Sequence, residues 1–372
     1  MNQNGGKMNI GKEPKKNEVS IWWVVCILLI MTLVYLSTGG IWEGNSVDEM
    51  TCAEKVIESV SSDIENIQMN LKDVDVVAHL VDSNKVEVDE TFYNNKEFIV
   101  ELKENNGKVV IQNRQMEDRG FRWFNLFRVK NDKYHKIEVN IPNSFRGELK
   151  IESTSGEIKV EDPLILAKLE VKTTSGDIQL EEVEAESKIV STSGVISIEK
   201  IKGENYEIRT TSGDIHLKEG QGNLTLATTS GESQLGCIVG DKHKLNSTSA
   251  DISIEEMQGE YEVGSTSGCF TVEKLKGYGV GEFTSGDVCI EEIELEGDMN
   301  FKTISGDIQL MFNEDVSASV DMNSRTGNIE GDVDIKYTNH HKTKATTQLG
   351  DHSLYTVEIQ TTSGEIYIEQ DS

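Results

Sequence analysis

Cysteine is scarce and shows no pattern typical of a metal site or a disulfide framework. The 372-residue sequence contains five cysteines, and no two of them form a CxxC pair. Cys26 lies in an apolar run near the N-terminus, whereas Cys52, Cys237, Cys269 and Cys289 follow that run. Export would permit disulfides, but without a recognisable spacing we expect free thiols. The sequence therefore predicts a fold that does not depend on cysteine chemistry.

Positive charge is also scarce. Lysine and arginine number 36 against 65 aspartates and glutamates, which gives a formal net charge of −29. Residues 1–42 hold four lysines and two glutamates, about +2, so the remainder carries about −31. Such an acidic surface repels nucleic acid and anionic lipid. We therefore expect no nucleic-acid partner.

One long stretch without charged residues lies near the N-terminus. The run Val19–Leu36 would span roughly 27 Å as a helix, enough to cross the core of a bilayer. Lysines precede this run and acidic residues follow it, which predicts a cytoplasmic N-terminus and an exported remainder. We predict a cytoplasmic tail at 1–18 and a single-pass transmembrane anchor at 19–38. A cleaved signal peptide is the alternative, although no small-x-small cleavage site follows closely.

A short motif repeats along most of the chain. "TTSGDI" occurs at Thr173–Ile178 and again at Thr210–Ile215, with relatives such as "STSGEI" and "FTSGDV". We take the glycine of each S-G corner as position 0 of its copy. Successive copies are 18 to 21 residues apart, except for a last spacing of 37 that indicates a degenerate copy or an excursion. The residues at position 0 are Gly156, Gly176, Gly194, Gly213, Gly231, Ala250, Gly268, Gly286, Gly306, Gly327 and Gly364.

Apolar residues stand at fixed offsets from each corner. Positions −5 and +2 are each apolar in ten of eleven copies, with Gly281 and Ser233 as the exceptions, and position +4 fails only at Gly331. Polar residues alternate with them, which is the period-two pattern of strands on both sides of a bend. No copy contains a helical stretch, and one copy cannot bury its own apolar face.

This pattern predicts an all-β fold. We expect a parallel β-solenoid (β-helix) with coils of about 18–20 residues stacked roughly 4.8 Å apart. One N-terminal transmembrane helix would precede it. A sandwich built from hairpins is the alternative, but it would show turns about every 8–12 residues.

The repeat pattern divides the exported part into three segments. We predict a juxtamembrane linker or a short helix at 39–62, an irregular β cap or initial coils at 63–141, and β-solenoid repeats at 142–372. A cap is expected because a bare terminal coil exposes an unpaired edge. The aromatic segment at 120–129 is either an interaction patch or part of the packing of this cap.

The S-G corners are predicted to be structural rather than catalytic. Ser or Thr occupies position −3 in ten copies and position −1 in all eleven. Strand alternation would place both hydroxyls inside, within reach of backbone groups, and glycine would permit a backbone angle closed to other residues. A nucleophilic serine needs an adjacent base, and no histidine column accompanies the corners. The predicted structural residues are Ser155, Gly156, Ser175, Gly176, Ser193, Gly194, Ser212, Gly213, Ser230, Gly231, Ser267, Gly268, Ser285, Gly286, Ser305, Gly306, Ser363 and Gly364.

An acidic column follows the corners. Position +1 is Asp or Glu in eight of eleven copies. One interpretation is a solvated corner whose carboxylate bonds local amides. The other is a ladder that binds Ca²⁺ or Mg²⁺, although hard cations need about six or more oxygens. We favour the first interpretation and expect no cofactor. The candidate metal ligands under the second are Asp177, Asp214, Asp251, Asp287 and Asp307.

The one long spacing is where a catalytic site would fit. Carbohydrate-active β-helix enzymes build their sites from paired carboxylates or metal ligands on loops beside the helix. The segment 328–363 contains such residue types, although two adjacent histidines on a strand would point to opposite faces. A carbohydrate-active enzyme acting on cell-surface polysaccharide is therefore the alternative function. The residues concerned are Asp332, Asp334, His340, His341, Asp351 and His352.

The corner motif resembles that of a known family. The stretches "IEVNIPNSFRGELKIESTSGEIKV", "TTSGDIQL" and "YTVEIQTTSGEIYIE" are similar to the bacterial DUF4097 family of β-strand repeat proteins, also described as "putative adhesins". The resemblance covers residues 63–372. It implies a β-solenoid in the cell envelope, in some cases linked to envelope-stress systems, and it implies no catalytic residues. Ala250, Val195 and Cys269 depart from the motif singly.

Together these features predict a non-enzymatic, membrane-anchored extracytoplasmic scaffold or binding protein of the cell envelope, similar to an adhesin. The expected partners are the membrane, through the anchor, and an envelope protein or polysaccharide. A regulatory sensor is a third hypothesis. About eighteen residues before the membrane are too few for a signalling domain, so a sensor would act through a membrane partner.

Overall fold

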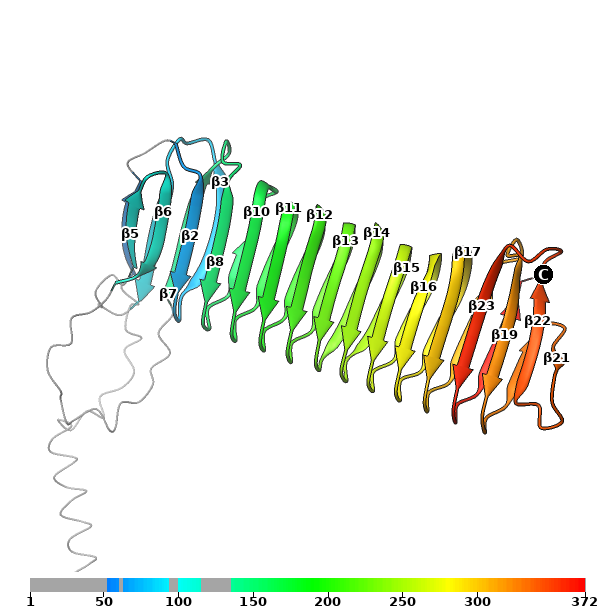
Figure 1. Cartoon of the computed structure of the whole chain (residues 1–372). Coiled ribbons are helices and arrows are strands. Elements are labelled where there is room, and N and C mark those ends of the chain that lie inside the picture. The colour runs from blue at the N-terminus through cyan, green and yellow to red at the C-terminus, as the bar shows by residue number, and fades with distance from the viewer. Residues whose placement is uncertain (1–51, 60–62, 94–99, 115–134, 372) are drawn as a thin grey trace, which may run out of the picture. The chain divides into compact units, whose positions relative to one another are not determined.

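The described part of the chain consists of β-strands (Figure 1). In the computed structural model, the residues described are 52–59, 63–93, 100–114 and 135–371. These ranges contain 24 strands and no helix, and so no helix of a length and apolarity that would cross a membrane. The predicted tail at 1–18, the anchor at 19–38 and the aromatic segment at 120–129 lie outside the described residues.

In the central coils one long strand runs from each S-G corner to the next. These strands pair in parallel with their neighbours in chain order, and Figure 1 shows them as a row of ribbons pointing the same way. We call the stretch that leads into a corner the incoming arm and the stretch that leaves it the outgoing arm. β10 (Leu164–Thr173) is the incoming arm of the first of these coils. The strands that run from corner to corner are β11 (Ile178–Ser191), β12 (Ile196–Thr210), β13 (Ile215–Thr228), β14 (Glu232–Ser247), β15 (Asp251–Ser265), β16 (Phe270–Phe283) and β17 (Val288–Thr303).

The coils stack in register, and this register builds the core. Ile178 pairs with Ile196, which pairs with Ile215, so equivalent positions of successive copies lie above one another. All three side chains are 0% exposed, and the residues between the inward positions are exposed or half-buried. The predicted apolar columns and parallel pairing are confirmed. Burial of a continuous column removes the apolar face that a single coil would leave in water.

At the N-terminal end the spatial order of the coils departs from the chain order. β2 pairs with both β6 and β8, and β3 pairs with both β7 and β9, so the β2–β3 coil lies inside the stack. β1 (Cys52–Glu58) pairs antiparallel with β4, which contradicts the helix alternative for that part of 39–62. The remaining strands are β2 (Asn66–Leu71), β3 (Asp75–Val81), β4 (Glu87–Tyr93), β5 (Val100–Asn105), β6 (Lys108–Asn113), β7 (His135–Pro142), β8 (Glu148–Ser153) and β9 (Ile158–Val160).

At the C-terminal end the spatial order of the coils also departs from the chain order. β23 pairs with β17 on one side and β19 on the other, and β24 pairs with β18 and β20, so the last coil is intercalated between two earlier ones. The long spacing is an excursion in which β22 pairs antiparallel with β19 and with β21. These strands are β18 (Ile308–Phe312), β19 (Ala318–Ser324), β20 (Ile329–Asp332), β21 (Lys336–Tyr337), β22 (Lys344–Leu349), β23 (Tyr355–Thr361) and β24 (Ile366–Gln370).

Candidate functional site

A hydroxyl at position −3 holds nine of the eleven corners. Thr173 Oγ1 accepts a hydrogen bond of 3.0 Å from the Gly176 amide, and Thr210 Oγ1 accepts one of 2.9 Å from the Gly213 amide. The same bond, 2.8–3.2 Å long, occurs in nine copies. Thr173 is 1% exposed, so the bond satisfies an amide that would otherwise be buried without a partner.

The serine at position −1 is exposed, contrary to the prediction that it lies inside. Ser175, Ser193 and Ser212 are exposed, as are the residues at position −2 before them. Strand alternation ends at position −3, because the chain turns there and presents two consecutive residues to solvent. The Thr-Ser pairs therefore form an outer rim, and the Ser193 amide donates to the Thr174 carbonyl of the preceding coil at 3.0 Å.

Glycine at position 0 is required by close approach, not mainly by an unusual backbone angle. A Cβ on Gly176 would overlap the carbonyl oxygen of Gly156, and a Cβ on Gly213 would overlap that of Gly194. Within these described corners a positive φ occurs at Gly231, where it is 104°. The next coil carries Ala250 at position 0, so the one unusual corner precedes the one corner with a methyl group.

The acidic column ties neighbouring coils together. Asp177 Oδ1 accepts a hydrogen bond of 2.8 Å from the amide of Val195 in the next coil. Asp214, Asp251, Asp287 and Asp307 accept the equivalent bond at 2.7–2.9 Å. Each carboxylate thus bonds an amide one coil away rather than a local one. Across the described part of the chain, no three His, Cys, Asp or Glu side chains are grouped as ligands for a metal ion.

The residues of the 328–363 excursion do not converge. Asp332, Asp334, Asp351 and His352 are exposed, as are His340 and His341. The two histidines lie in the turn between β21 and β22 rather than on a strand, which corrects the premise that they point to opposite faces of one.

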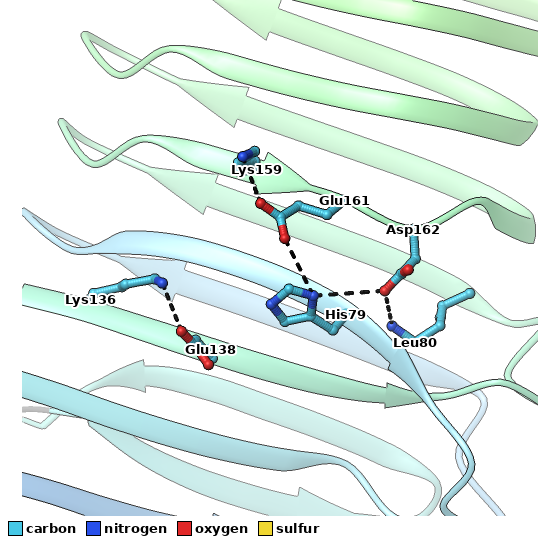
Figure 2. Close-up of polar contacts among 7 residues, drawn as sticks. All are labelled: His79, Leu80, Lys136, Glu138, Lys159, Glu161 and Asp162. Carbon is cyan, nitrogen blue, oxygen red and sulfur yellow. Dashed lines mark hydrogen bonds and ion pairs between the residues drawn. The ribbon is translucent and has the colours of Figure 1, made fainter.

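A polar cluster around His79 joins β3 to the turn after β9, and Figure 2 shows its contacts. His79 Nδ1 lies 3.8 Å from Glu161 Oε2 and 3.7 Å from Asp162 Oδ2. Asp162 Oδ2 also accepts a hydrogen bond of 2.8 Å from the Leu80 amide. The bond from Lys159 holds the pKa of Glu161 below its ordinary value. The sequence did not indicate this cluster, because His79 and its partners lie about eighty residues apart.

An open groove of about 510 Å³ crosses the incoming arms of five coils. On β16, Gly279 stands between Tyr261 and Met299 of the neighbouring strands. Gly279 has a φ of 154°, and a Cβ there would overlap the Tyr261 carbonyl oxygen. Gly279 therefore lines the groove with backbone alone. The sequence did not indicate this groove, because the one break in the apolar column at position −5, Gly281, is buried beside Phe301 and Phe283 and does not line it.

Tyr278 and Val280 are the apolar residues at the centre of this groove. They are 38% and 46% exposed, which is unusual for large apolar side chains in this stack. The pairing of β16 with β17 shifts register between Gly277 and Gly279, and Gly297 lies against the Tyr278 ring, where a Cβ would overlap it. The ring is therefore held at the surface by the backbone of the next coil.

Charged groups flank the tyrosine on both sides. On one side Glu260 and Glu262 pair with Lys242 and Lys244, at 2.7 and 2.5 Å. On the other side Asp298 Oδ1 accepts a hydrogen bond of 2.8 Å from the Thr356 amide. Glu358 Oε2 accepts a hydrogen bond of 2.9 Å from Asn300 Nδ2. We call these groove-lining residues the Tyr278 groove: Lys242, Glu260, Tyr261, Glu262, Tyr278, Gly279, Val280, Asp298, Met299, Asn300, Thr356 and Glu358.

The two carboxylates beyond Tyr278 differ from those before it. Within the part of the chain that the structure describes, Asp298 and Glu358 form no ion pair. The Thr356 amide and Asn300 Nδ2, which donate hydrogen bonds to them, are neutral. Glu358 and Thr356 belong to β23, and the intercalated last coil therefore completes the groove.

A buried histidine lies near this groove in the core. His243 is 0% exposed, its Nε2 lies 2.8 Å from the Gln258 carbonyl oxygen, and its Nδ1 accepts the Leu224 amide at 3.4 Å. Burial lowers the pKa of His243 below its ordinary value. Both ring nitrogens are occupied by backbone groups, so we assign the residue to packing rather than to chemistry.

Comparison with known families agrees with the repeat and its corners. The family described as Toastrack DUF4097 matches residues 64–237 and 222–369, which together span most of the chain. The chain belongs to the Toastrack DUF4097 family. This confirms the resemblance derived from the T-S-G-[DE]-I corner, and the match begins at residue 64, so the irregular N-terminal coils fall within the Toastrack region. Comparison with curated proteins finds no match.

Comparison with solved structures gives matches at low identity and low TM-score. A protein described as a "putative cell adhesion protein" from Clostridium sporogenes is 10% identical, with 86% of this chain and 100% of that chain covered and a TM-score of 0.20. A "putative lipid binding protein" from Parabacteroides distasonis is 14% identical, with 84% and 96% covered and a TM-score of 0.36. A "putative adhesin" from Bacteroides fragilis is 10% identical, with 85% and 97% covered and a TM-score of 0.27.

Proposed function

We propose that this Toastrack chain is a non-catalytic, membrane-anchored binding scaffold that is exported to the cell envelope. The observation that carries the proposal is the register of the coils. Because equivalent positions pair directly from coil to coil, outward side chains recur along the stack at one-coil intervals. A partner with its own repeating chemistry, such as a polysaccharide or an extended envelope protein, would contact several coils at once.

The outward surface supports a role in display rather than in catalysis. Lysines and glutamates one coil apart form ion pairs along it, such as Lys276 with Glu294 at 2.6 Å and Lys274 with Glu292 at 3.4 Å. Exposed pairs of this kind contribute little stability. The corner serines Ser175, Ser193 and Ser212 are exposed, and their backbone amides donate to carbonyls of the preceding coil. These features favour a rigid scaffold whose outer positions are available for recognition.

The proposed membrane topology rests on the sequence. The apolar run with lysines before it and acidic residues after it predicts an uncleaved anchor with the bulk of the chain outside. Protease added to intact cells stripped of their wall should digest residues after 43 and spare the N-terminal tail. Recovery of most of the native protein in the soluble cytoplasmic fraction would contradict the proposal.

A substrate panel tests the non-catalytic part of the proposal. We expect the purified full chain to hydrolyse neither polysaccharides nor esters, with or without Ca²⁺. The matched variant changes His340 and His341 together to Ala, since both are exposed and their loss should leave the fold intact. Turnover by the wild type that disappears in this variant at an unchanged melting temperature would establish the enzyme alternative.

A further inference from the structure

We propose that the Tyr278 groove binds a glycan whose sugars carry free amino groups. The proposal rests on the proposed function as a binding scaffold and adds to it the chemistry of the ligand. Three observations carry it: an exposed aromatic ring, carboxylates without cationic partners, and a groove that extends along the stack. Each of these selects a different property of the ligand.

The aromatic ring selects a ligand with a flat apolar face or a cation. Tyr278 is held at the surface by Gly297 and the register shift beside it, so its ring does not need to be ordered on binding. Val280 extends the apolar surface by one more exposed side chain. A tyrosine face attracts ammonium groups and packs against apolar surfaces, and a rigid ring loses little entropy on binding.

The carboxylates select positive charge. Glu260 and Glu262 are neutralised by Lys242 and Lys244, whereas Asp298 and Glu358 have only neutral hydrogen-bond donors among the described residues. These two carboxylates lie on the two coils that follow Tyr278 in space. An ammonium group beside either carboxylate would form charge-assisted hydrogen bonds. A neutral ligand would not gain this effect.

The length of the groove selects a chain of sugars over a single small cation. The groove crosses five adjacent coils, from Lys242 on β14 to Glu358 on β23, and is open rather than enclosed. Between the charged residues, Asn300 and Thr356 offer an amide and a hydroxyl to ligand hydroxyls. An amino glycan combines apolar sugar faces, hydroxyls and evenly spaced ammonium groups, so it matches all the lining chemistry.

Oligosaccharides that differ only in acetylation test the proposal directly. The full chain, purified in neutral detergent, is titrated calorimetrically with a chitosan tetrasaccharide and with the chitin tetrasaccharide, in which acetyl groups remove the ammonium charge. We expect binding of the first, weakened by added salt because exposed charges are screened, and roughly tenfold weaker or no binding of the second. Absence of chitosan binding, or equal binding of both, would overturn the proposal.

Paired variants locate the binding. Tyr278→Ala should weaken chitosan binding roughly tenfold, and Glu358→Gln, which keeps the shape of the side chain, should weaken it and reduce its dependence on salt. The matched controls are Tyr367→Ala and Glu369→Gln, which change an exposed tyrosine and a glutamate on β24 outside the groove. Loss of binding in the controls as well, or in neither groove variant, would refute the site, as would full displacement of chitosan by an oligolysine of equal charge.

The same titrations separate this inference from the proposed function. If chitosan binds and is recovered intact, both stand. If it does not bind and the protease experiment still places the chain outside the membrane, only the ligand is wrong. If the oligosaccharide is bound and cleaved, the non-catalytic scaffold itself is refuted.

Discussion

At the scale of single residues, the two hydroxyls of each corner have different roles. The hydroxyl at position −3 is buried and accepts the amide of the corner glycine, whereas the serine at position −1 faces solvent. Their sequence signals are nearly identical, because both are small hydroxyl residues at alternate positions. Only the turn between them separates a buried side chain that bonds the corner amide from one that faces solvent.

Substitutions at one corner should separate these roles. Thr210→Val keeps the shape of the side chain but leaves the Gly213 amide buried without a partner, so we expect a loss of about 1–3 kcal/mol in the free energy of unfolding. Ser212→Ala changes an exposed residue and should cost less than about 0.5 kcal/mol. Urea unfolding measures both. Equal losses, or a larger one for Ser212→Ala, would show that the corner is assigned incorrectly.

The corner glycine should tolerate no side chain where its neighbour approaches closely. Gly213→Ala forces a Cβ into the Gly194 carbonyl oxygen, and we expect a loss of about 1–3 kcal/mol or more. Gly264→Ala is the control, because its Cβ would meet nothing closer than Asn246 Oδ1 at 3.4 Å. Thermal melts compare the two. A harmless Gly213→Ala change would mean that the coils are not in the close contact described.

His243 should make stability depend on pH in the acidic range. Burial lowers its pKa in the folded protein, so below pH 6.5 the unfolded chain binds a proton that the folded chain does not. Acidification below pH 6.5 therefore lowers the free energy of unfolding by up to about 1.4 kcal/mol per pH unit, until the pH reaches the pKa of His243 in the folded state. Above pH 6.5 this group causes no such loss.

Urea midpoints at pH 7.5 and 5.5 test this, with His243→Gln as the reference that cannot titrate. The wild type should lose more stability on acidification than the variant does. An identical loss in both proteins would assign the pH dependence to the carboxylates instead.

At the scale of elements, the order of the coils is the unexpected feature. β23 and β24 come last in the chain but pair on both sides with earlier strands. The copy at Gly364 therefore lies between the copies at Gly306 and Gly327. This placement also gives Thr356 and Glu358 to the Tyr278 groove.

Engineered cysteine pairs should report this order. Lys302 and Gln360 face each other in adjacent strands and are exposed, so cysteines there, with the native ones replaced by serine, should form a disulfide. Lys302 with Asn323 is the control pair, since β23 lies between them at a separation of roughly 10 Å. Efficient oxidation of the control pair and not of the first would show that the coils stack in chain order.

The repeats were predictable from the sequence, and the ends were not. Ile178, Ile196 and Ile215 occupy one column, because a one-residue slip would turn every inward side chain outward. Pairing partners at the ends are chosen by contacts between segments that are far apart, such as His79 with Asp162, and no local pattern encodes them. The Tyr278 groove is lined by residues of five coils, one of them the intercalated last coil, and no single copy of the repeat encodes it.

At the scale of the whole molecule, the anchor is a prediction from the sequence, whereas the coil stack is described by the structure. Each inward column and each corner bond is repeated, so stability is spread along the array rather than concentrated in one core. The outward positions carry little of it. This division is what allows a scaffold to vary its surface, and the recognition role proposed above depends on it.

Distances between corners test the in-register stack most directly. Spin labels are placed at Ser175 and, in turn, at Ser285, Ser363 and Thr326, all exposed rim positions, in a chain whose native cysteines are serine. These sites are six, eight and nine coils from Ser175 in space. At roughly 4.8 Å per coil, double electron–electron resonance should give distances between the labels of about 29, 38 and 43 Å. The label at Ser363 should be nearer than that at Thr326, although it comes later in the sequence. Distances that do not grow in this order, or that reverse the last two, would contradict the account.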